Sequence, residues 1–472
     1  MAALSTTDNN CGVAFPELKT DSGIKSEKSD YQNLIKIANT SIKDLTYNND
    51  SLLVFPEVLG AFEDGIEDQH IFDLSGNPDE LKSVKLTTGN IMGFIGIGNT
   101  QLKITSRFSK NDKKDFFLHY MLEKVFSINL FDYKYTSGNG ELDLLIFLFP
   151  RLLKKALAQG IFRQYQTFHR NDANVKGVID ANRHIKQNIP FCGKIAYTSR
   201  ERTFDNPITQ LIRHTVECIK TKKFGNAVLN CDTEMRKCVQ EIIAATPSYN
   251  LHGREKTITE NLKSVNHPYY TAYKPLQKLC LAILQHKKIG FGKSNHKVYG
   301  ILFDGAWLWE EYLATILKSI NFLHPQNKKH KGGIKMFEND FEESTFDKNH
   351  RRIYPDFYRL ENNSDKNFIL DAKYKHLQNT IAREDLYQVV TYMHTMKIDE
   401  GGFIYPLEQS DSTTSIDFKS YKLAGYGGNV NTYGVPVPAQ ETYPAFVESM
   451  KLIERNIINK FPIGSKETDK NT

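Results

Sequence analysis

Two short apolar runs toward the C-terminal end of the chain contain charged residues that strands rarely hold. The first, YPDFYRL at 354–360, contains Asp356, and the second, LDAKYKH at 370–376, contains Asp371 and Lys373. Asp and Lys are poor strand formers, so a strand that contains both needs a reason. Because residues two apart in a strand point to the same side of the sheet, we expect Asp371 and Lys373 to share one face.

This set of residues has the composition of a site that cleaves phosphodiesters. Asp356 and Asp371 could bind Mg²⁺ or Mn²⁺, hard cations that take oxygen ligands and retain several waters. Such an ion lowers the pKa of a bound water, which Lys373 could then orient or deprotonate. The flanking runs NFIL and RRIY are apolar enough to bury both strands, so the charges need compensation. The alternative is an exposed hairpin with an ordinary Asp–Lys ion pair.

Two predicted helices add further candidates on either side of the hairpin. Upstream, LWEEYL places Glu310 on a helix as a third carboxylate, with Glu311 as a competing choice. Downstream, DLYQVVTY places Gln388 and Tyr392 one helical turn apart on the same face. Taken alone, Glu310 is typical of a solvated helix residue and Tyr392 of a core residue. Their order around the hairpin favours a common site.

Composition limits the class of protein without deciding it. The 472 residues are 40% hydrophobic, which is enough for more than one domain, and the formal net charge is +6. A mild positive charge suits an anionic partner such as nucleic acid but does not require one. The six cysteines form no CxxC pair and no disulfide framework, which favours reduced thiols and a cytoplasmic protein.

Several common functions lack their motifs in this sequence. GFGKS at 290–294 resembles the end of a phosphate-binding loop, but position 287 is lysine where that loop needs glycine, so we expect no nucleotide hydrolysis by this chain. The scattered histidines do not predict a zinc site. The start of the chain does not resemble a secretory signal. The apolar run at 142–150 is too short to span a membrane, so no membrane contact is expected.

The order of predicted elements indicates an α/β (α+β) protein. Residues 1–35 are rich in Ser, Thr, Asp and Lys and predict a flexible tail. Residues 36–295 predict a β-rich part followed by helices. The basic, glycine-containing stretch at 287–297 marks a domain boundary, and residues 296–464 follow as helix, strand, strand, helix and strand. Residues 465–472 predict a second flexible tail.

The hairpin and its flanking helices resemble the PD-(D/E)xK nuclease superfamily. The resemblance implies a restriction-endonuclease-like domain over 296–464 that requires Mg²⁺ or Mn²⁺. It assigns Glu310, Asp356 and Asp371 as metal ligands and catalytic residues, with Lys373 and Gln388 as further catalytic residues. Gln388 and Tyr392 complete the QxxxY pattern of that superfamily, and Pro355 completes the PD.

Upstream phrases extend the resemblance to the McrC family of McrBC-type restriction systems and its LlaJI relatives. They are GFIGIGNTQLKITSRF, NVKGVIDANRHIKQN and GKIAYTSRERTFDNPITQLIRHT. The resemblance implies a nuclease subunit, active in anti-phage defence, that cuts double-stranded DNA after translocation. It implies a partner, a McrB-like hexameric AAA+ GTPase, which residues 36–295 engage and stimulate. Dimerisation of the nuclease domains is a further implication. Candidate arginines for acting on the partner's nucleotide are Arg200, Arg202 and Arg213.

Two other functions remain open at this stage. A stand-alone RecB-like or Mrr-like nuclease would nick DNA with metal alone and need no motor. A catalytically inactive assembly or adaptor subunit would retain the fold without the chemistry. The joint presence of Asp356, Asp371 and Lys373 argues against the inactive subunit, because a dead site needs none of them.

Overall fold

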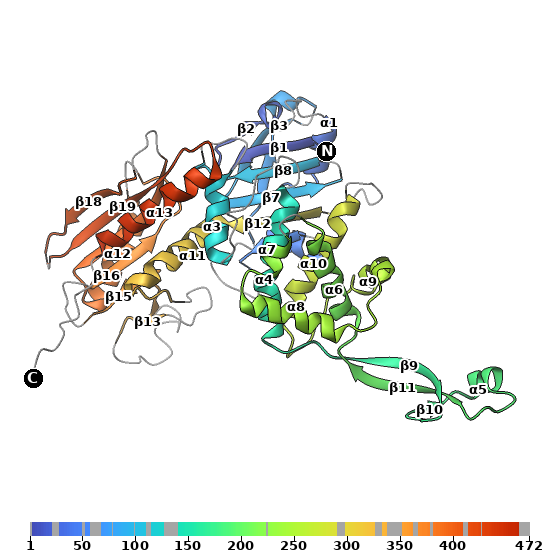
Figure 1. Ribbon diagram of the computed structural model, residues 1–472. Helices are drawn as coiled ribbons and strands as arrows, with labels where there is room; N and C mark the ends of the chain where they lie inside the picture. Colours follow the sequence, from blue (N-terminus) through green and yellow to red (C-terminus); the bar gives the residue numbers. More distant parts are fainter. Residues whose placement is uncertain are drawn as a thin grey trace, which may run out of the picture. The chain divides into compact units, whose positions relative to one another are not determined.

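The computed structural model describes residues 2–20, 28–49, 52–56, 68–77, 79–98, 100–109, 115–126, 140–222, 225–289, 298–325, 333–337, 352–361, 367–377, 381–408, 414–425 and 427–461. They fall into two compact units, the first made of Met1–Ser127 with Asn295–Thr472 and the second of Ile128–Ser294. Each unit combines helices and strands (Figure 1), so the prediction of a mixed α/β protein is confirmed.

The first sheet of unit 1 joins strands from distant parts of the chain. Its strands, in spatial order, are β3 (Lys19–Thr20), β1 (Ala2–Thr7), β8 (Thr100–Thr105), β7 (Ile91–Ile97), β12 (Val298–Asp304) and β4 (Leu52–Phe55). β1 runs parallel to β8, whereas β7 is antiparallel to both β8 and β12. All residues of β7 are buried, as expected for a central strand.

Smaller elements cover this sheet. They are α1 (Lys28–Leu34), α2 (Ile42–Asn48) and a three-stranded sheet in the order β2 (Val13–Ala14), β6 (Lys85–Thr88) and β5 (Phe72–Ser75). Leu34, Ile42 and Leu86 from these elements belong to the same apolar core as Ile95 and Leu102 of the sheet. These elements therefore share one apolar core with part of the sheet.

β1 lies where the sequence predicted a flexible tail over residues 1–35. Leu4 is fully buried and stands opposite Leu102 in parallel register. The polar composition of this segment suggested disorder. Instead, the backbone of β1 pairs in parallel with that of β8 along its whole length. Residues 21–27, the predicted tail at 465–472 and the GFGKS stretch lie outside the described residues.

The predicted domain boundary at residue 296 falls at the edge of unit 2, but the next strand does not begin a separate domain. β12 pairs with β7 and β4 and so completes the sheet of N-terminal strands. Residues 36–295 are correspondingly divided, since those up to Ser127 belong to unit 1 and the remainder to unit 2. Strand pairing between segments so far apart leaves no local signal in the sequence.

The second sheet of unit 1 has the spatial order β15 (Phe357–Arg359), β16 (Phe368–Ala372), β17 (Glu400–Glu408), β19 (Asn429–Val437) and β18 (Asp417–Lys422). β16, β17 and β19 are parallel, and β15 and β18 are antiparallel edge strands. α12 (Arg383–Met396) connects β16 to β17 and packs on the face that contains Ile369, Phe403 and Tyr405. This crossover is the usual solution for joining parallel strands.

Three further helices and one short sheet complete unit 1. The helices are α3 (Phe116–Phe126), α11 (Gly305–Leu317) and α13 (Tyr443–Lys460), and β13 (Ile334–Lys335) pairs with β14 (Arg352–Ile353). α11 contacts β16, α3 and α13. Asp304 caps α11 by accepting hydrogen bonds from the backbone N–H groups of Ala306 and Trp307. The predicted strand and helix at the start of this region are thus present.

Unit 2 is a helical body with a projecting β-arm. Its helices are α4 (Gly140–Leu157), α6 (Pro207–Lys220), α7 (Gly225–Leu229), α8 (Thr233–Ala245), α9 (Arg254–Glu260) and α10 (Tyr273–Ile289). The arm is the antiparallel hairpin of β9 (Gln164–Asp172) and β11 (Ile195–Thr203), with β10 (Val178–Ile179) and α5 (Ala181–Gln187) at its far end (Figure 1). Among the described residues, no helix has the length and apolar character needed to cross a membrane.

The close approach of β12 to β7 provides a test of the six-stranded sheet. A Cβ at Gly300 would lie 2.3 Å from the carbonyl oxygen of Phe94, so Gly300→Ala must push the two strands apart. We expect a loss of roughly 1–3 kcal/mol in the free energy of unfolding. The measurement is thermal melting beside Gly89→Ala, whose Cβ would meet nothing nearer than 3.9 Å. Equal melting temperatures for the two variants would contradict the β7–β12 pairing.

Candidate active site

The Asp356 side chain forms a hydrogen bond between the two strands of the predicted hairpin. Asp356 lies one residue before β15, so the strand is shorter than the sequence predicted. Its Oδ2 accepts a hydrogen bond of 2.8 Å from the backbone N–H of Ala372, the last residue of β16. The Asp356 carboxylate therefore faces the segment that contains Asp371 and Lys373.

Asp371 lies within β16 and is only 2% exposed. Burial and the neighbouring charge of Asp356 raise its pKa to about 7, despite the opposing effect of Lys373. Its Oδ2 forms an ion pair with Lys373 Nζ at 2.7 Å. A buried carboxylate beside a second carboxylate fits a bound cation.

Lys373 follows the last residue of β16, and its ammonium group lies among several acceptors. Nζ is 2.7 Å from Asp371 and 3.3 Å from Asp385 Oδ1, and it donates to Gln388 Oε1 at 3.4 Å. Burial by itself lowers the pKa of Lys373, but the charges of Asp371, Asp385 and Asp356 outweigh it and raise the pKa. A lysine held protonated in this way is suited to orient a water or offset charge, and is a poor general base.

Gln388 and Tyr392 lie on the face of α12 that meets the hairpin, as their spacing predicted. Gln388 Nε2 donates to Tyr392 Oη at 2.7 Å, and Tyr392 Oη donates to the carbonyl oxygen of Tyr354 at 3.2 Å. Tyr392 is also buried in the core with Ile369 and Phe403. It is therefore a core residue and a member of this hydrogen-bond chain at once.

Asp385 is a residue of the site that the sequence reasoning missed. Its carboxylate contacts Lys373 and forms a close ion pair with Lys375. Burial raises its pKa, but the two lysines together lower it below the usual range. The available signal was its spacing, since Asp385, Gln388 and Tyr392 recur at intervals of three and four residues and share one helix face.

Glu310 reaches the hairpin through a histidine. It lies on α11, with Oε1 3.7 Å from His324 Nε2, and His324 Nδ1 donates to the backbone carbonyl of Asp356 at 2.9 Å. The imidazole stacks on Phe357, with ring centroids 4.8 Å apart. No three His, Cys, Asp or Glu side chains among the described residues form a group that could hold a metal ion. The structure thus brings together Asp356 and Asp371, without Glu310 as a third member.

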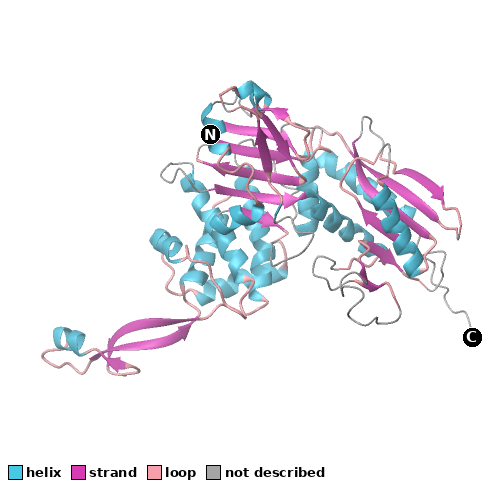
Figure 2. Ribbon diagram, turned by 180° about the vertical axis from the view of Figure 1, so that it is seen from behind, coloured by secondary structure: helices cyan, strands magenta, loops and turns pink. Residues whose placement is uncertain are grey.

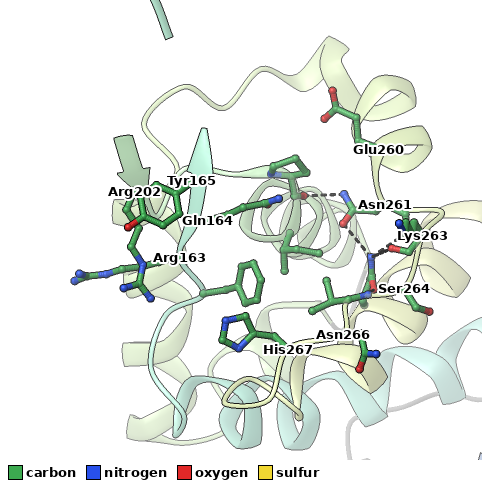
Figure 3. A pocket seen from close by; sticks show the side chains of 15 residues that line it. Arg163, Gln164, Tyr165, Arg202, Glu260, Asn261, Lys263, Ser264, Asn266 and His267 are labelled. Atoms are coloured by element: carbon green, nitrogen blue, oxygen red, sulfur yellow. Dashed lines mark hydrogen bonds between the residues drawn. The ribbon is translucent and has the colours of Figure 1, made fainter. Parts of the chain in front are cut away.

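The three candidate arginines lie in unit 2 in different settings. Arg200 lies on β11, with its guanidinium carbon 5.0 Å from the centroid of the Tyr165 ring. Arg213 pairs with Glu217 at 2.9 Å on α6. Arg202 lines a pocket of about 440 Å³ at the base of the arm (Figure 3). Arg163, Lys263 and the acidic Glu260 also line this pocket, so basic side chains outnumber acidic ones in its lining.

Comparison with known proteins decides the family. The family model described as McrBC 5-methylcytosine restriction system component matches residues 86–406, well over half of the chain. The chain belongs to this family. The match spans β8, the whole of unit 2 and the segment from Glu310 to Tyr392. The resemblance to McrC predicted from the sequence is confirmed.

Solved structures agree with the McrC family assignment at the level of the fold. The chain resembles one from a Thermococcus gammatolerans half-complex of McrB AAA+ hexamers with bound McrC, with a TM-score of 0.51 and 16% identity over 97% of this chain and 100% of that one. A second match, from a cryo-EM structure of the T. gammatolerans McrBC complex, has a TM-score of 0.32 and 17% identity over 67% and 87% of the two chains, and adds no argument. No curated protein matches.

The raised pKa of Asp371 predicts how stability depends on pH in the metal-free protein. The folded value is about 7 and the ordinary value 3.8, so stability from protonated Asp371 is complete below about pH 4 and is lost as the pH rises through 7. Asn resembles the protonated form and does not titrate. Asp371→Asn should therefore melt at a higher temperature than the parent at pH 8, with a smaller difference at pH 5.

The measurement is a series of melting curves in EDTA between pH 5 and pH 8. Glu384→Gln, which removes an exposed carboxylate from the same unit, is the matched control and should show no such pH-dependent difference. If Asp371→Asn is the less stable protein at pH 8, the carboxylate contributes a favourable interaction at that pH and the assigned direction of the pKa shift is wrong.

Proposed function

We propose that this McrC family member is the Mg²⁺- or Mn²⁺-dependent endonuclease subunit of a McrBC-like restriction system and cleaves double-stranded DNA. The observation that carries the proposal is the convergence of Asp356, Asp371 and Lys373, with the buried Asp371 beside the Asp356 charge and 2.7 Å from Lys373 Nζ. The parallel strands β16 and β17 with α12 between them support a PD-(D/E)xK type of nuclease domain.

Asp356 and Asp371 are the residues that would hold the metal ion. When bound, the ion supplies a water of lowered pKa and positive charge next to the scissile phosphate. The carboxylates provide anionic oxygens, and a cation between them removes the repulsion that raises the pKa of Asp371. His324 donates to the backbone carbonyl of Asp356, and Glu310 lies 3.7 Å from the same imidazole.

Lys373 serves as a fixed positive charge. Asp371, Asp385 and Gln388 surround its ammonium group and restrict where it can point. In that position it orients the attacking water and offsets the charge that builds on the phosphate. Preorganised charge of this kind acts strongly where water is partly excluded. This role differs from the alternative of deprotonating the water, because the pKa of Lys373 is raised.

Replacing Lys373 tests this chemistry. Lys373→Ala should lower the single-turnover rate of DNA cleavage roughly 10²- to 10⁴-fold, the range of one charge-stabilising or proton-transfer group. Binding of DNA in Ca²⁺ should change little, since one phosphate contact among many has a small share of affinity. Lys373→Arg should not restore the rate, because a planar guanidinium does not replace an ammonium group. Cleavage by Lys373→Ala at the parent rate would overturn the role.

We also propose that the partner is a McrB-like hexameric AAA+ GTPase and that unit 2 engages it. The far part of the arm is the end of the hairpin that projects from the helical body (Figure 2). Its exposed large apolar side chains are Val178, Ile179, Ile185, Ile189 and Phe191. A group of exposed apolar residues on a projecting element is typical of a protein–protein contact. The basic pocket at the base of the arm offers a second surface, suited to an acidic segment of the partner.

The far part of the arm can be tested separately from cleavage. Phe191→Asp should raise, by about tenfold or more, the concentration of this chain that half-maximally stimulates GTP hydrolysis by the AAA+ partner, as loss of a central apolar anchor usually does. Leu251→Asp is the matched control, because Leu251 is 65% exposed and Phe191 66% exposed, and both are in unit 2. Identical stimulation curves for the two variants would exclude Phe191 from the contact.

DNA cleavage, measured with and without the partner beside GTP hydrolysis, separates the remaining alternatives. A stand-alone RecB-like or Mrr-like nuclease would cut at full rate with metal and without the partner. An inactive assembly subunit would stimulate GTP hydrolysis and cut under no condition. The proposed function requires cleavage that depends on the partner, on GTP and on Asp371.

A further inference from the structure

The residue that follows Lys373 is held by the N-terminal sheet of unit 1. Tyr374 comes after the end of β16, and the Arg107 guanidinium donates a short hydrogen bond from Nη2 to its backbone carbonyl. The hydroxyls of Ser106 and Tyr374 are 2.7 Å apart, and the Arg107 guanidinium carbon lies 4.8 Å from the centroid of the Tyr374 ring. Two consecutive residues after β8 thus fix both the backbone and the side chain of Tyr374.

Arg107 is itself held by two other segments of that sheet. Asp8, directly after β1, accepts a hydrogen bond of 2.6 Å from the Arg107 backbone N–H, and its Oδ2 lies 3.4 Å from Arg107 Nη1. Asn90, directly before β7, accepts from Nη1 at 2.9 Å. The guanidinium therefore connects the ends of β1 and β8 and the start of β7 to the chain after Lys373.

The Asp8–Arg107 ion pair is buried, and burying such a pair does not by itself make the fold more stable. Asp8 is fully buried and the Arg107 side chain is 8% exposed. Burial raises the pKa of Asp8 to about 7 even though Arg107 opposes the shift. Among the described residues, Asp8 Oδ2 and Arg107 Nε each lack a hydrogen-bond partner. Replacing such a pair with apolar residues of the same volume often leaves a protein equally stable or more stable. A satisfied polar network, in contrast, specifies one geometry.

Two backbone contacts fix the chain at Lys373. The Lys373 N–H donates to the carbonyl of Ile404 on β17 at 3.0 Å, and Arg107 donates to the carbonyl of the next residue, Tyr374. Since β16 ends at Ala372, Arg107 supplies a restraint on the chain after Lys373 that the strand ladder does not. We propose that Arg107, supported by Asp8 and Ser106, is a positioning residue that sets where the Lys373 ammonium group points. The inference rests on the nuclease function proposed above.

The test is Arg107→Met in the full chain with its AAA+ partner, measured by single-turnover cleavage at saturating protein and Mg²⁺. We expect the rate constant to fall roughly 10- to 10²-fold, the usual effect of displacing a catalytic group by about 1 Å. The fraction of DNA cut at the end point, DNA affinity in Ca²⁺ and stimulation of GTP hydrolysis should stay unchanged. Arg254→Met is the control, because Arg254 likewise donates to a backbone carbonyl, that of Leu284, but in unit 2.

A purely structural role would give a different pattern. It would lower the fraction of DNA cut, in proportion to misfolded protein, and leave the rate constant of the folded fraction at the parent value; that result overturns the inference. If Arg107→Met does not fold, Tyr374→Phe keeps the ring and removes the hydroxyl, which contacts Ser106 and lies 3.2 Å from Met92 Sδ. It should slow cleavage several-fold, and an unchanged rate for that variant also overturns the inference.

The two proposals fail in distinguishable ways. If the parent protein and Asp371→Asn are equally inactive with partner, GTP and Mg²⁺, the nuclease function itself is wrong. If the parent cuts, Asp371→Asn does not, and Arg107→Met cuts at the parent rate, only the positioning role is wrong.

Discussion

The candidate site depends on a buried negative charge that protein groups compensate only in part. Asp371 lies within a parallel strand next to Asp356, and Lys373 is its nearby cation. The site's surroundings follow from this constraint. Asp385 and Gln388 restrict the lysine, Ala372 donates to the Asp356 side chain, and His324 donates to the Asp356 backbone carbonyl. A divalent cation would complete the compensation, which links metal binding to the pKa of Asp371.

Unit 1 places this site next to a sheet made largely from the other end of the chain. β12 and α11 pass directly from the six-stranded sheet to the helix that contains Glu310, and Arg107 connects the same sheet to Tyr374. The N-terminal strands and the strands of the candidate site therefore form one compact unit. Unit 2, with its arm and basic pocket, is inserted between them in the sequence and offers surfaces for a partner without contributing to the site's residues.

The residues of the site differ in how far the sequence could reveal them. Asp356, Asp371 and Lys373 are close in the sequence and lie in or beside strands, so alternation and composition suffice to select them. Gln388 and Tyr392 follow from helix periodicity, and the same periodicity could have selected Asp385. His324 and Arg107 have no such signal, because their partners are 32 and 267 positions away along the chain. Glu310 was selected for its helix, but only the fold showed that His324 lies between it and Asp356.

The sequence alone determined the McrC resemblance, the α/β class, the residue types of the site and the helices that contain Glu310 and Gln388, since these depend on local periodicity and short motifs. Tertiary structure decided which strands share a sheet. It made a polar N-terminal segment into β1 and paired β12 with β7 rather than with the strands of the candidate site. It also raised the pKa of Asp371 and the pKa of Lys373 through groups brought together by folding. Strand pairing and burial depend on contacts between distant segments, and a linear pattern of residues does not contain those contacts.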